Sequence, residues 1–410
     1  MSRRPEAPAA PPRVSRVALA RLEAGLSAQA RQDIAAAARL WAGVKEAGGR
    51  VVVATGSGPN LHEGVTTMLA ACVAAGMVDG ILTSSAVAGH EMAGTLERVR
   101  RVDGRKLGLS PEILPADGKV EVSLLGAGEL ERLGRQVVID LDHYRRLLAA
   151  PGHEIIKVAG NLAYPTGLWV ERLARQMEPL AQSAGLPLEA VVGLGCHPLT
   201  MLGACARRGE PCLVTTPQLV GGGQVGLALG DSISLTRRSS LVAEVLAGAD
   251  LIIESGLALA QEIHDGPFEL FTGHGLWARH EGLATFSLRH KHLVRIDLDP
   301  AIRRAWELQQ SAQSVARAID QGLPKAAHLD LPFRMEMSGF ARLPNSRPIT
   351  GDLGAVWPVL AGRAAKSLGV KLGFVCYKQG SELGEALRGY IVDEVRPMDP
   401  SAAIQALRER

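Results

Sequence analysis

Short runs of apolar, largely β-branched residues that each lead into a glycine- or serine-rich loop restrict the fold of this chain more than any other feature. The first run, at 50–54, precedes a loop at 55–60, and a second run, at 78–83, ends in a Ser-Ser-Ala loop. A helical pattern at 61–75 separates the two runs. Because a strand, a helix and a second strand in close succession form a parallel βαβ unit, the sequence predicts a parallel sheet.

Later parts of the chain repeat this pattern. The sequence predicts further strands at 190–194, 211–216, 250–254, 292–297 and 372–376, with helices between them. Runs this continuously apolar are typical of strands that are buried on both faces. We therefore expect an α/β fold: a parallel, Rossmann-like sheet with helices on both faces and a small C-terminal α/β appendage.

The expected domain organisation has three parts. Residues 1–13, rich in proline, alanine and arginine, form a disordered leader, and residues 14–330 form the ligand-binding α/β domain, which opens with a helical pattern at 14–48. Residues 331–410 form an extension that packs on this domain, and the proline-containing segment 328–350 is expected to be a connection.

The composition excludes several other classes of protein. Hydrophobic residues make up 47% and charged residues 21% of the 410 residues, as in ordinary globular proteins. The net charge of +3 is too small to indicate a nucleic acid or a membrane as partner. The sequence has neither an apolar run of about 18 residues nor the apolar core of a secretion signal, so we expect a cytoplasmic protein. The scattered cysteines indicate reduced thiols, and the histidine spacings fit no usual zinc site.

The candidate cofactor-binding residues follow the predicted strands, because parallel sheets bind ligands beyond the carboxyl ends of their strands. Glycines there let a phosphate or ribose approach the backbone, although each loop can also be a plain tight turn. Two aspartates after the strand at 292–297 can bind ribose hydroxyls, and the second can instead cap a helix from Pro300. The candidates are Gly58, Asn60, Leu61, Ser84, Ser85, Ala86, Gly222, Gly223, Ser255, Gly256, Asp297 and Asp299.

Two pairs of adjacent histidine and carboxylate residues are the candidates for proton transfer. They are His90 with Glu91 and His264 with Asp265, and a histidine beside a carboxylate can exchange protons with a substrate. A solvated helix start is the alternative for the first pair. Glu254 is a candidate carboxylate for holding a substrate ammonium group. A Cys–His pair at 196–197 and an imine-forming Lys378 are weaker alternatives, and no metal is expected.

The stretch 59–86 resembles the NAD-binding segment of deoxyhypusine synthase. That family has Ser-Asn-Leu, a helix and then Met-Val-Asp-Val-Leu-Val-Thr-Thr-Ala, where this chain has Pro-Asn-Leu, a helix and Met-Val-Asp-Gly-Ile-Leu-Thr-Ser-Ser-Ala. Segments at 208–222 and 250–256 resemble that family in the same order. The Ile-Asp-Leu-Asp-Pro run at 296–300 and the Ala-Gly-His-Glu run at 88–91 resemble archaeal-type ornithine cyclodeaminases of the LOR/SDH-like group.

Both families share an NAD-binding parallel sheet. The resemblance therefore implies NAD as cofactor, an amino acid or amine as substrate, and an enzyme that works by transient hydride transfer and assembles as a homodimer or homotetramer. Gly221 replaces the synthase's acidic residue, Gln261 and Glu262 replace its paired histidines, and its lysine has no visible counterpart, so hypusine formation is not expected. A non-catalytic nucleotide-binding or regulatory protein of the same fold is the alternative. A middle domain of a thiamine-diphosphate enzyme is disfavoured, because no partner domain with the metal-binding motif is visible.

Overall fold

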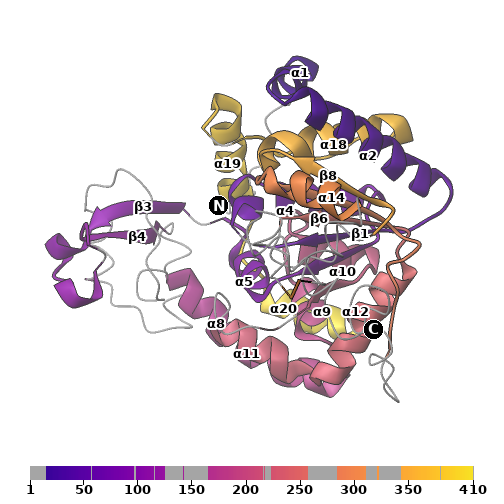
Figure 1. Ribbon diagram of the computed structural model, residues 1–410. Coiled ribbons are helices and arrows are strands. Elements are labelled where there is room, and N and C mark those ends of the chain that lie inside the picture. The colour runs from indigo at the N-terminus through magenta and orange to yellow at the C-terminus, as the bar shows by residue number, and fades with distance from the viewer. Residues whose placement is uncertain are drawn as a thin grey trace, which may run out of the picture.

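Figure 1 shows the computed structural model of the chain. The structure describes residues 15–56, 58–96, 98–114, 116–124, 142, 165–215, 217, 223–256, 284–310, 321–322, 343–378 and 380–409. Three of the candidate residues, Gly222, His264 and Asp265, lie outside these ranges. Their predicted roles stay predictions.

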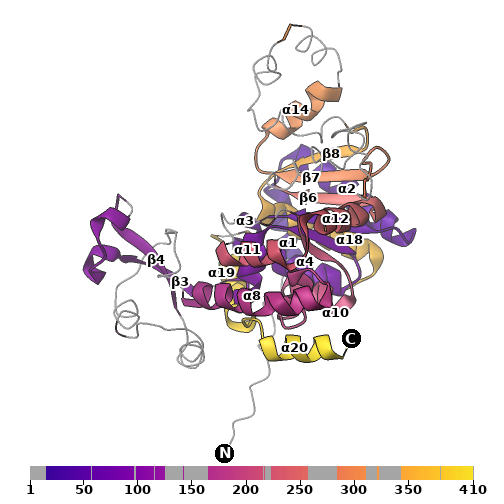
Figure 2. The same ribbon diagram turned by 90° about the horizontal axis from the view of Figure 1, so that it is seen from below.

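The centre of the described chain is a six-stranded sheet in which every strand pair is parallel. The strands are β1 (Val51–Thr55), β2 (Gly80–Thr83), β5 (Cys212–Val214), β6 (Leu251–Ser255), β7 (His292–Asp297) and β8 (Ser346–Thr350). Their order across the sheet is β5-β2-β1-β6-β7-β8, and Figure 2 shows β6, β7 and β8 side by side. The predicted parallel α/β sheet is therefore confirmed.

The strand order shows that the chain winds outward twice from the middle of the sheet. From β1 it passes through β2 to β5 at one edge, and it then returns to β6 and passes through β7 to β8 at the other edge. This is the doubly wound order of Rossmann-type sheets. β1 and β6 are neighbours, with Val51 opposite Leu251 and Thr55 opposite Ser255.

Helices cover both faces of this sheet, as the sequence predicts. Val51 and Val53 belong to one buried apolar cluster and Val52 to another, and because successive strand side chains point to opposite faces, the two clusters lie on the two sides of the sheet. The first cluster includes residues of α2 (Ala28–Glu46), α4 (Val65–Ala74) and α18 (Leu353–Leu368), and the second includes residues of α12 (Leu235–Gly248) and α14 (Ala301–Gln310). α18 packs along α2, so the two ends of the described chain share one layer (Figure 1).

The helix predicted at 14–48 is two helices. Gly25 ends α1 (Arg16–Ala24), and Ser27 caps α2, since its hydroxyl accepts a hydrogen bond of 3.0 Å from the Ala30 N–H. The other described α-helices are α3 (Pro59–His62), α5 (Ser85–Ala93), α8 (Pro165–Ala184), α9 (Leu188–Gly193), α10 (Met201–Arg208), α11 (Gly223–Ser232), α19 (Glu382–Glu394) and α20 (Pro400–Arg408).

Two predicted strands are wrong. The segment 190–194 belongs to helix α9 and the turn after it, because the Glu189 carboxylate accepts a hydrogen bond from the Val214 N–H and pairs with Arg238. These contacts hold the segment as a helix beside β5 and override its β-branched composition. The segment 372–376 is irregular, and its apolar run instead buries Phe374 and Cys376 in the core.

Two elements beyond residue 342, β8 and α18, are part of the main fold. The sequence predicts a connection at 328–350 and an appendage beyond it. The structure places β8 in the central sheet and α18 against the face that α2 also covers. A separate antiparallel pair, β3 (Arg98–Asp103) and β4 (Lys119–Leu124), projects from the central sheet with the short 3-10 helices η1 (Gly104–Leu107) and η2 (Pro111–Ile113) between its strands (Figures 1 and 2).

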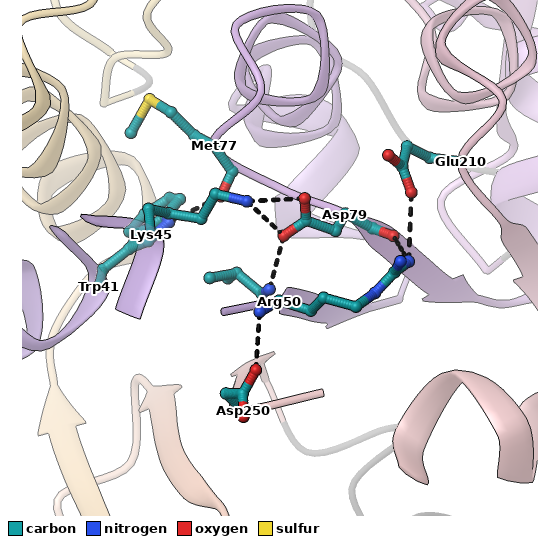
Figure 3. Close-up of polar contacts among 8 residues, drawn as sticks. Trp41, Lys45, Arg50, Met77, Asp79, Glu210 and Asp250 are labelled. Carbon is teal, nitrogen blue, oxygen red and sulfur yellow. Dashed lines mark hydrogen bonds and ion pairs between the residues drawn. The ribbon is translucent and has the colours of Figure 1, made fainter. Parts of the chain in front are cut away.

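Hydrogen bonds and ion pairs of charged residues connect the chain segments at the amino end of the sheet (Figure 3). Lys45 Nζ lies 2.7 Å from both carboxylate oxygens of Asp79. The Arg50 N–H donates to Asp250 at 2.8 Å, and the Arg50 guanidinium lies 3.3 Å from Glu210. The segments before β1, β2, β5 and β6 are thereby tied together at the edge opposite the one where such sheets bind ligands.

Two further findings concern the helices and the cysteines. Within the described ranges, every helix is too short or too polar to cross a lipid bilayer. All five cysteines are buried free thiols, which agrees with the reduced state that the sequence predicts.

Candidate functional site

The carboxyl ends of β1 and β6 are where a sheet of this order forms a crevice. The next strands of this sheet after β1 and β6 in the chain are β2 and β7, which lie on opposite sides of the β1–β6 pair. The loop after β1 begins at Gly56 and the loop after β6 begins at Gly256. Several of the predicted cofactor residues fall in these two loops.

Asn60 and Ser255 join the two loops by a pair of hydrogen bonds. Ser255 Oγ donates to Asn60 Oδ1 at 2.5 Å, and Asn60 Nδ2 donates to the Ser255 carbonyl oxygen at 3.3 Å. Each residue is only 3% exposed. The structure thus brings together two predicted candidates that are 195 residues apart in the sequence.

Trp357, on α18, completes this contact and was not among the predicted candidates. Its Nε1 donates to Ser255 Oγ at 2.7 Å, and its side chain is fully buried. The Ser255 hydroxyl therefore accepts from the indole while it donates to Asn60. Sequence reasoning missed Trp357 because a tryptophan inside a largely apolar helix has the pattern of an ordinary core residue.

Glycines give both loops space beside their backbones. Gly58 has φ +73° and Gly256 has φ +82°, a conformation that favours glycine. Among the described residues, no atom lies within 4 Å of the place where a Cβ would stand at either position. A phosphate or ribose can therefore approach either backbone, whereas the neighbouring Leu61 is in the core and anchors its loop.

The loop after β2 lies next to this crevice. Ser84 caps α5, since its hydroxyl accepts from the Val87 N–H at 3.4 Å, while Ser85 is buried and Ala86 is half-buried. Because α5 follows a parallel strand, its N-terminus lies at the carboxyl edge of the sheet, where a helix N-terminus favours an anion.

The two aspartates after β7 have local structural roles. Asp297 Oδ1 accepts from the Asp299 N–H at 3.0 Å, and Asp299 Oδ1 accepts from the Ala301 N–H at 2.9 Å. Asp299 therefore caps α14, which is the alternative that the sequence analysis left open. Asp297 is 6% exposed, which leaves little of its carboxylate for a ribose.

Glu91, a predicted candidate for proton transfer, lies deep in the protein. It is fully buried, and its two carboxylate oxygens accept from the N–H groups of Met201 at 2.8 Å and Leu202 at 2.9 Å. Burial raises the pKa of Glu91 to about 7, while those two hydrogen bonds act in the opposite direction. Glu91 thus holds the first turn of α10, and its part in proton transfer stays a prediction.

Glu254 and His90 have different surroundings. Glu254 points to the face of the sheet opposite Ser255, is 1% exposed, and lies 4.0 Å from the guanidinium of the equally buried Arg295 on the next strand. The role of Glu254 in holding a substrate ammonium group stays a prediction. His90, a predicted candidate for proton transfer, is half-buried on α5. Gly223, a predicted cofactor-binding residue, is the first residue of α11 and has φ +50°.

A cavity of about 720 Å³ opens at the carboxyl ends of β7 and β8. It lies on the β8 side of the crevice. Its walls carry charges of both signs, and Arg303 on one wall forms an ion pair with Asp33. The charged and polar lining residues include Arg21, Gln29, Asp33, Arg303, Arg304, Glu307, Asp352 and Lys378.

Two carboxylates, Glu63 and the cavity-lining Asp352, lie near each other. Glu63 follows α3, three residues after Asn60, and Asp352 follows β8. Glu63 Oε2 and Asp352 Oδ1 are buried atoms without a hydrogen-bond partner among the described residues, and Lys378 Nζ lies 3.9 Å from Asp352 Oδ2. Burial, together with the Asp352 charge, raises the pKa of Glu63 to about 7. A Cβ at position 354 would stand 2.5 Å from Glu63 Oε2, so this packing requires a glycine there.

The local sequence gave no signal for the Glu63–Asp352 pair. Each carboxylate is unremarkable in its own segment, and only the tertiary fold brings them together. The weaker Cys196–His197 alternative gains no support, because Cys196 is buried and burial lowers the pKa of His197 to about 4. Within the described residues, no group of three histidine, cysteine or acidic side chains is placed to hold a metal ion.

Comparisons with known proteins give only distant likenesses. No known family description and no curated protein matches the sequence. Among solved structures, ArgZ, an arginine dihydrolase from the ornithine–ammonia cycle in cyanobacteria, matches with a TM-score of 0.39 and 14% identity over 81% of this chain and 31% of ArgZ. The ternary complex of AgrE with ornithine and NAD+ matches with a TM-score of 0.41 and 16% identity over 83% of this chain and 34% of AgrE.

A conserved LOR/SDH protein from Methanococcus maripaludis S2 matches with a TM-score of 0.40 and 12% identity over 84% of this chain and 69% of that protein. This chain spans about a third of the length of ArgZ and AgrE. Likenesses at this level do not establish a shared activity. What the molecule itself defines is a doubly wound α/β protein in which hydrogen bonds connect Asn60 and Ser255 at the switch point of the sheet. The resemblance to deoxyhypusine synthase stays a prediction.

Proposed function

We propose that this chain is an NAD-dependent enzyme that acts on an amino acid or amine by transient hydride transfer. The observation that carries the proposal is the doubly wound strand order with two glycine-containing loops at its switch point, since folds of this order bind dinucleotides there. When bound, NAD+ would supply a hydride acceptor for a carbon next to nitrogen, and the NADH so formed would be the hydride donor.

The residues around the crevice fit a dinucleotide. The open backbone at Gly58 and Gly256 leaves room for the sugar–phosphate chain, and the N-terminus of α5, with Ser84 and Ser85, suits a pyrophosphate. Asn60 and Ser255 hold the two loops at a fixed separation. Gly222 and Gly223 remain candidates for a second phosphate contact.

The cavity beside β8 is the proposed place for the substrate. It adjoins the crevice and contains charges of both signs, which suits a small zwitterionic molecule. In place of Glu91 and Glu254, we propose Glu63 for proton transfer, because it is half-buried at this junction and its raised pKa suits an acid–base group near neutral pH. His90, His264 and Asp265 remain candidates.

Analysis of the small molecules that freshly purified protein releases on denaturation tests the cofactor. We expect NAD+ or NADH by mass spectrometry, and binding of added NAD+ by calorimetry. A protein that releases neither and binds no NAD+ would contradict the proposal. When NAD+ is present, transfer of deuterium from α-deuterated amino acids and amines to the nicotinamide ring tests the hydride step.

A non-catalytic nucleotide-binding or regulatory protein is the second candidate. It is favoured by the contacts of Glu91 and Glu254, which engage these two carboxylates with groups of the protein. It predicts NAD+ binding without deuterium transfer from any amino acid or amine. A Glu63→Gln variant that binds NAD+ normally and abolishes transfer would decide in favour of the enzyme.

A further inference from the structure

We infer that Trp357 is a positioning residue for the dinucleotide crevice: its indole N–H fixes the Ser255–Asn60 contact that joins the two crevice loops. The inference rests on the proposed function. According to this inference, a residue from the C-terminal part of the chain helps to set the geometry of a site whose loops lie near residues 60 and 255.

The hydrogen bonds form a directed chain. Trp357 Nε1 donates to Ser255 Oγ at 2.7 Å, and Ser255 Oγ then donates to Asn60 Oδ1 at 2.5 Å. With the indole as donor, the Ser255 proton points toward Asn60, and this in turn orients the Asn60 amide so that Nδ2 donates to the Ser255 carbonyl. Removal of the indole N–H frees the hydroxyl to rotate and loosens the contact between the loops.

The packing of the indole ring alone does not explain this arrangement. The Trp357 ring meets the Trp41 ring edge to face, with centroids 6.3 Å apart and an interplanar angle of 84°. A phenyl ring could make the same kind of contact. The N–H group is the part of the side chain that reaches the carboxyl end of β6, which is why a substitution can separate its role from that of the ring.

The test measures the Kd for NAD+ and the Tm of each variant and compares both quantities with those of the wild type. Trp357→Phe keeps a buried aromatic ring and removes the donor. We expect its Kd for NAD+ to rise about fivefold to tenfold, the typical effect of one lost hydrogen bond. Ser255→Ala removes the other end of the same bond and should raise the Kd similarly, and the double variant should add little to either loss.

The chain offers two matched controls. Trp306 Nε1 donates to Ser346 Oγ at 2.8 Å, which is the same pair of groups at the amino end of β8. Trp41 Nε1 donates to the Met77 carbonyl oxygen at 2.8 Å and is as buried as Trp357 (Figure 3). Trp306→Phe should lower the Tm while the Kd for NAD+ stays within about twofold of the wild type. Trp41→Phe changes the ring that packs on Trp357 and leaves the Trp357 N–H in place, so it should weaken NAD+ binding less than Trp357→Phe does.

The outcomes are distinct. Weakened binding in Trp357→Phe and Ser255→Ala that exceeds any loss in the controls supports the inference. Equal Kd values in all variants, or equal losses in the controls, would overturn it. If Trp357→Phe does not fold, Ser255→Ala alone decides by the same comparison. Wild-type protein that binds no NAD+ contradicts the proposed function itself, before any variant is made.

Discussion

At the scale of single residues, burial separates carboxylates that hold the fold from carboxylates that can meet a ligand. Glu91 and Glu254 have the residue type that proton transfer or ammonium binding requires, but each is almost fully enclosed and engaged with protein groups. Glu63 lies on a half-buried turn at the edge of the crevice. The sequence shows which residues are carboxylates and does not show how deep each one lies.

A substitution at Glu91 tests its structural role. In Glu91→Gln, an amide nitrogen replaces one acceptor oxygen, so the N–H of Met201 or Leu202 loses its partner. We expect the free energy of unfolding to fall by about 1–3 kcal/mol, the cost of an unsatisfied buried donor. Urea unfolding measures this change. At the exposed Glu112 of η2, Glu112→Gln should cost less than about 0.5 kcal/mol, and equal losses would contradict the assignment.

At the scale of elements, one buried ion pair joins α9, α12 and β5. Arg238 of α12 and Glu189 of α9 have side chains that are 1% and 0% exposed. Glu189 accepts from the Val214 N–H at 2.9 Å, and Arg238 donates to the Val214 carbonyl oxygen at 3.0 Å and to the Leu229 carbonyl oxygen at 2.6 Å. The pair thus holds the edge strand β5 in place, because Glu189 binds the N–H group of Val214 and Arg238 binds its carbonyl oxygen.

Adjacent arginines on α12 give a matched test of this pair. Arg238→Met leaves the Glu189 charge buried without its partner, and we expect the free energy of unfolding to fall by about 3–5 kcal/mol. Arg237 is 58% exposed and lies 3.7 Å from Glu244, so Arg237→Met should cost less than about 1 kcal/mol. Urea denaturation of both variants measures the difference. Similar urea midpoints for the two variants would show that the buried ion pair contributes little to holding β5 in the fold.

Elements differ in how well the sequence predicts them. β1, β2, β6 and β7 are continuous apolar runs, so their pattern alone indicates buried strands. β8 was missed because Pro348 and the charged Arg347 do not resemble a central strand, and proline is compatible with a strand at the edge of a sheet. The run at 190–194 was mistaken for a strand because its valines are β-branched, while distant contacts of Glu189 decide its conformation.

At the scale of the whole molecule, buried ionisable groups make stability depend on pH. The pKa of Glu63 and that of Glu91 are both raised from 4.5 to about 7. Between these values the folded state binds more protons than the unfolded state, so these groups lower the free energy of unfolding as pH rises. His197, whose pKa is lowered from 6.5 to about 4, acts in the opposite direction between pH 4 and 6.5.

A variant isolates one of these contributions. Glu63→Gln stays neutral at every pH, so it removes one of the groups that destabilise the protein as pH rises from about 5 to 7. We expect the free energy of unfolding of the variant to decline less with pH than that of the wild type over this interval. Unfolding by urea at several pH values measures the two slopes. Parallel curves would show that Glu63 has an ordinary pKa.

The candidate site was predictable only in part. The glycine loops and the residues Asn60 and Ser255 follow strands, so the parallel-sheet rule identified them from sequence alone. Trp357 and Asp352 arrive from a segment far along the chain, and no local pattern shows that they meet those loops. A prediction of these contacts requires the strand order, which depends on tertiary packing and is absent from the hydrophobic pattern of any single segment.

The central place of β1 has a consequence for synthesis of the protein. Arg50 and Asp250, which precede the neighbouring strands β1 and β6, are 200 residues apart in the chain. A ribosome that adds about 5–20 residues per second takes about 10–40 s to make the intervening segment. During this interval one edge of the apolar β1 has no partner strand and is open to pairing with other chains. The nascent chain, rather than the finished protein, is therefore where shielding by a chaperone matters most.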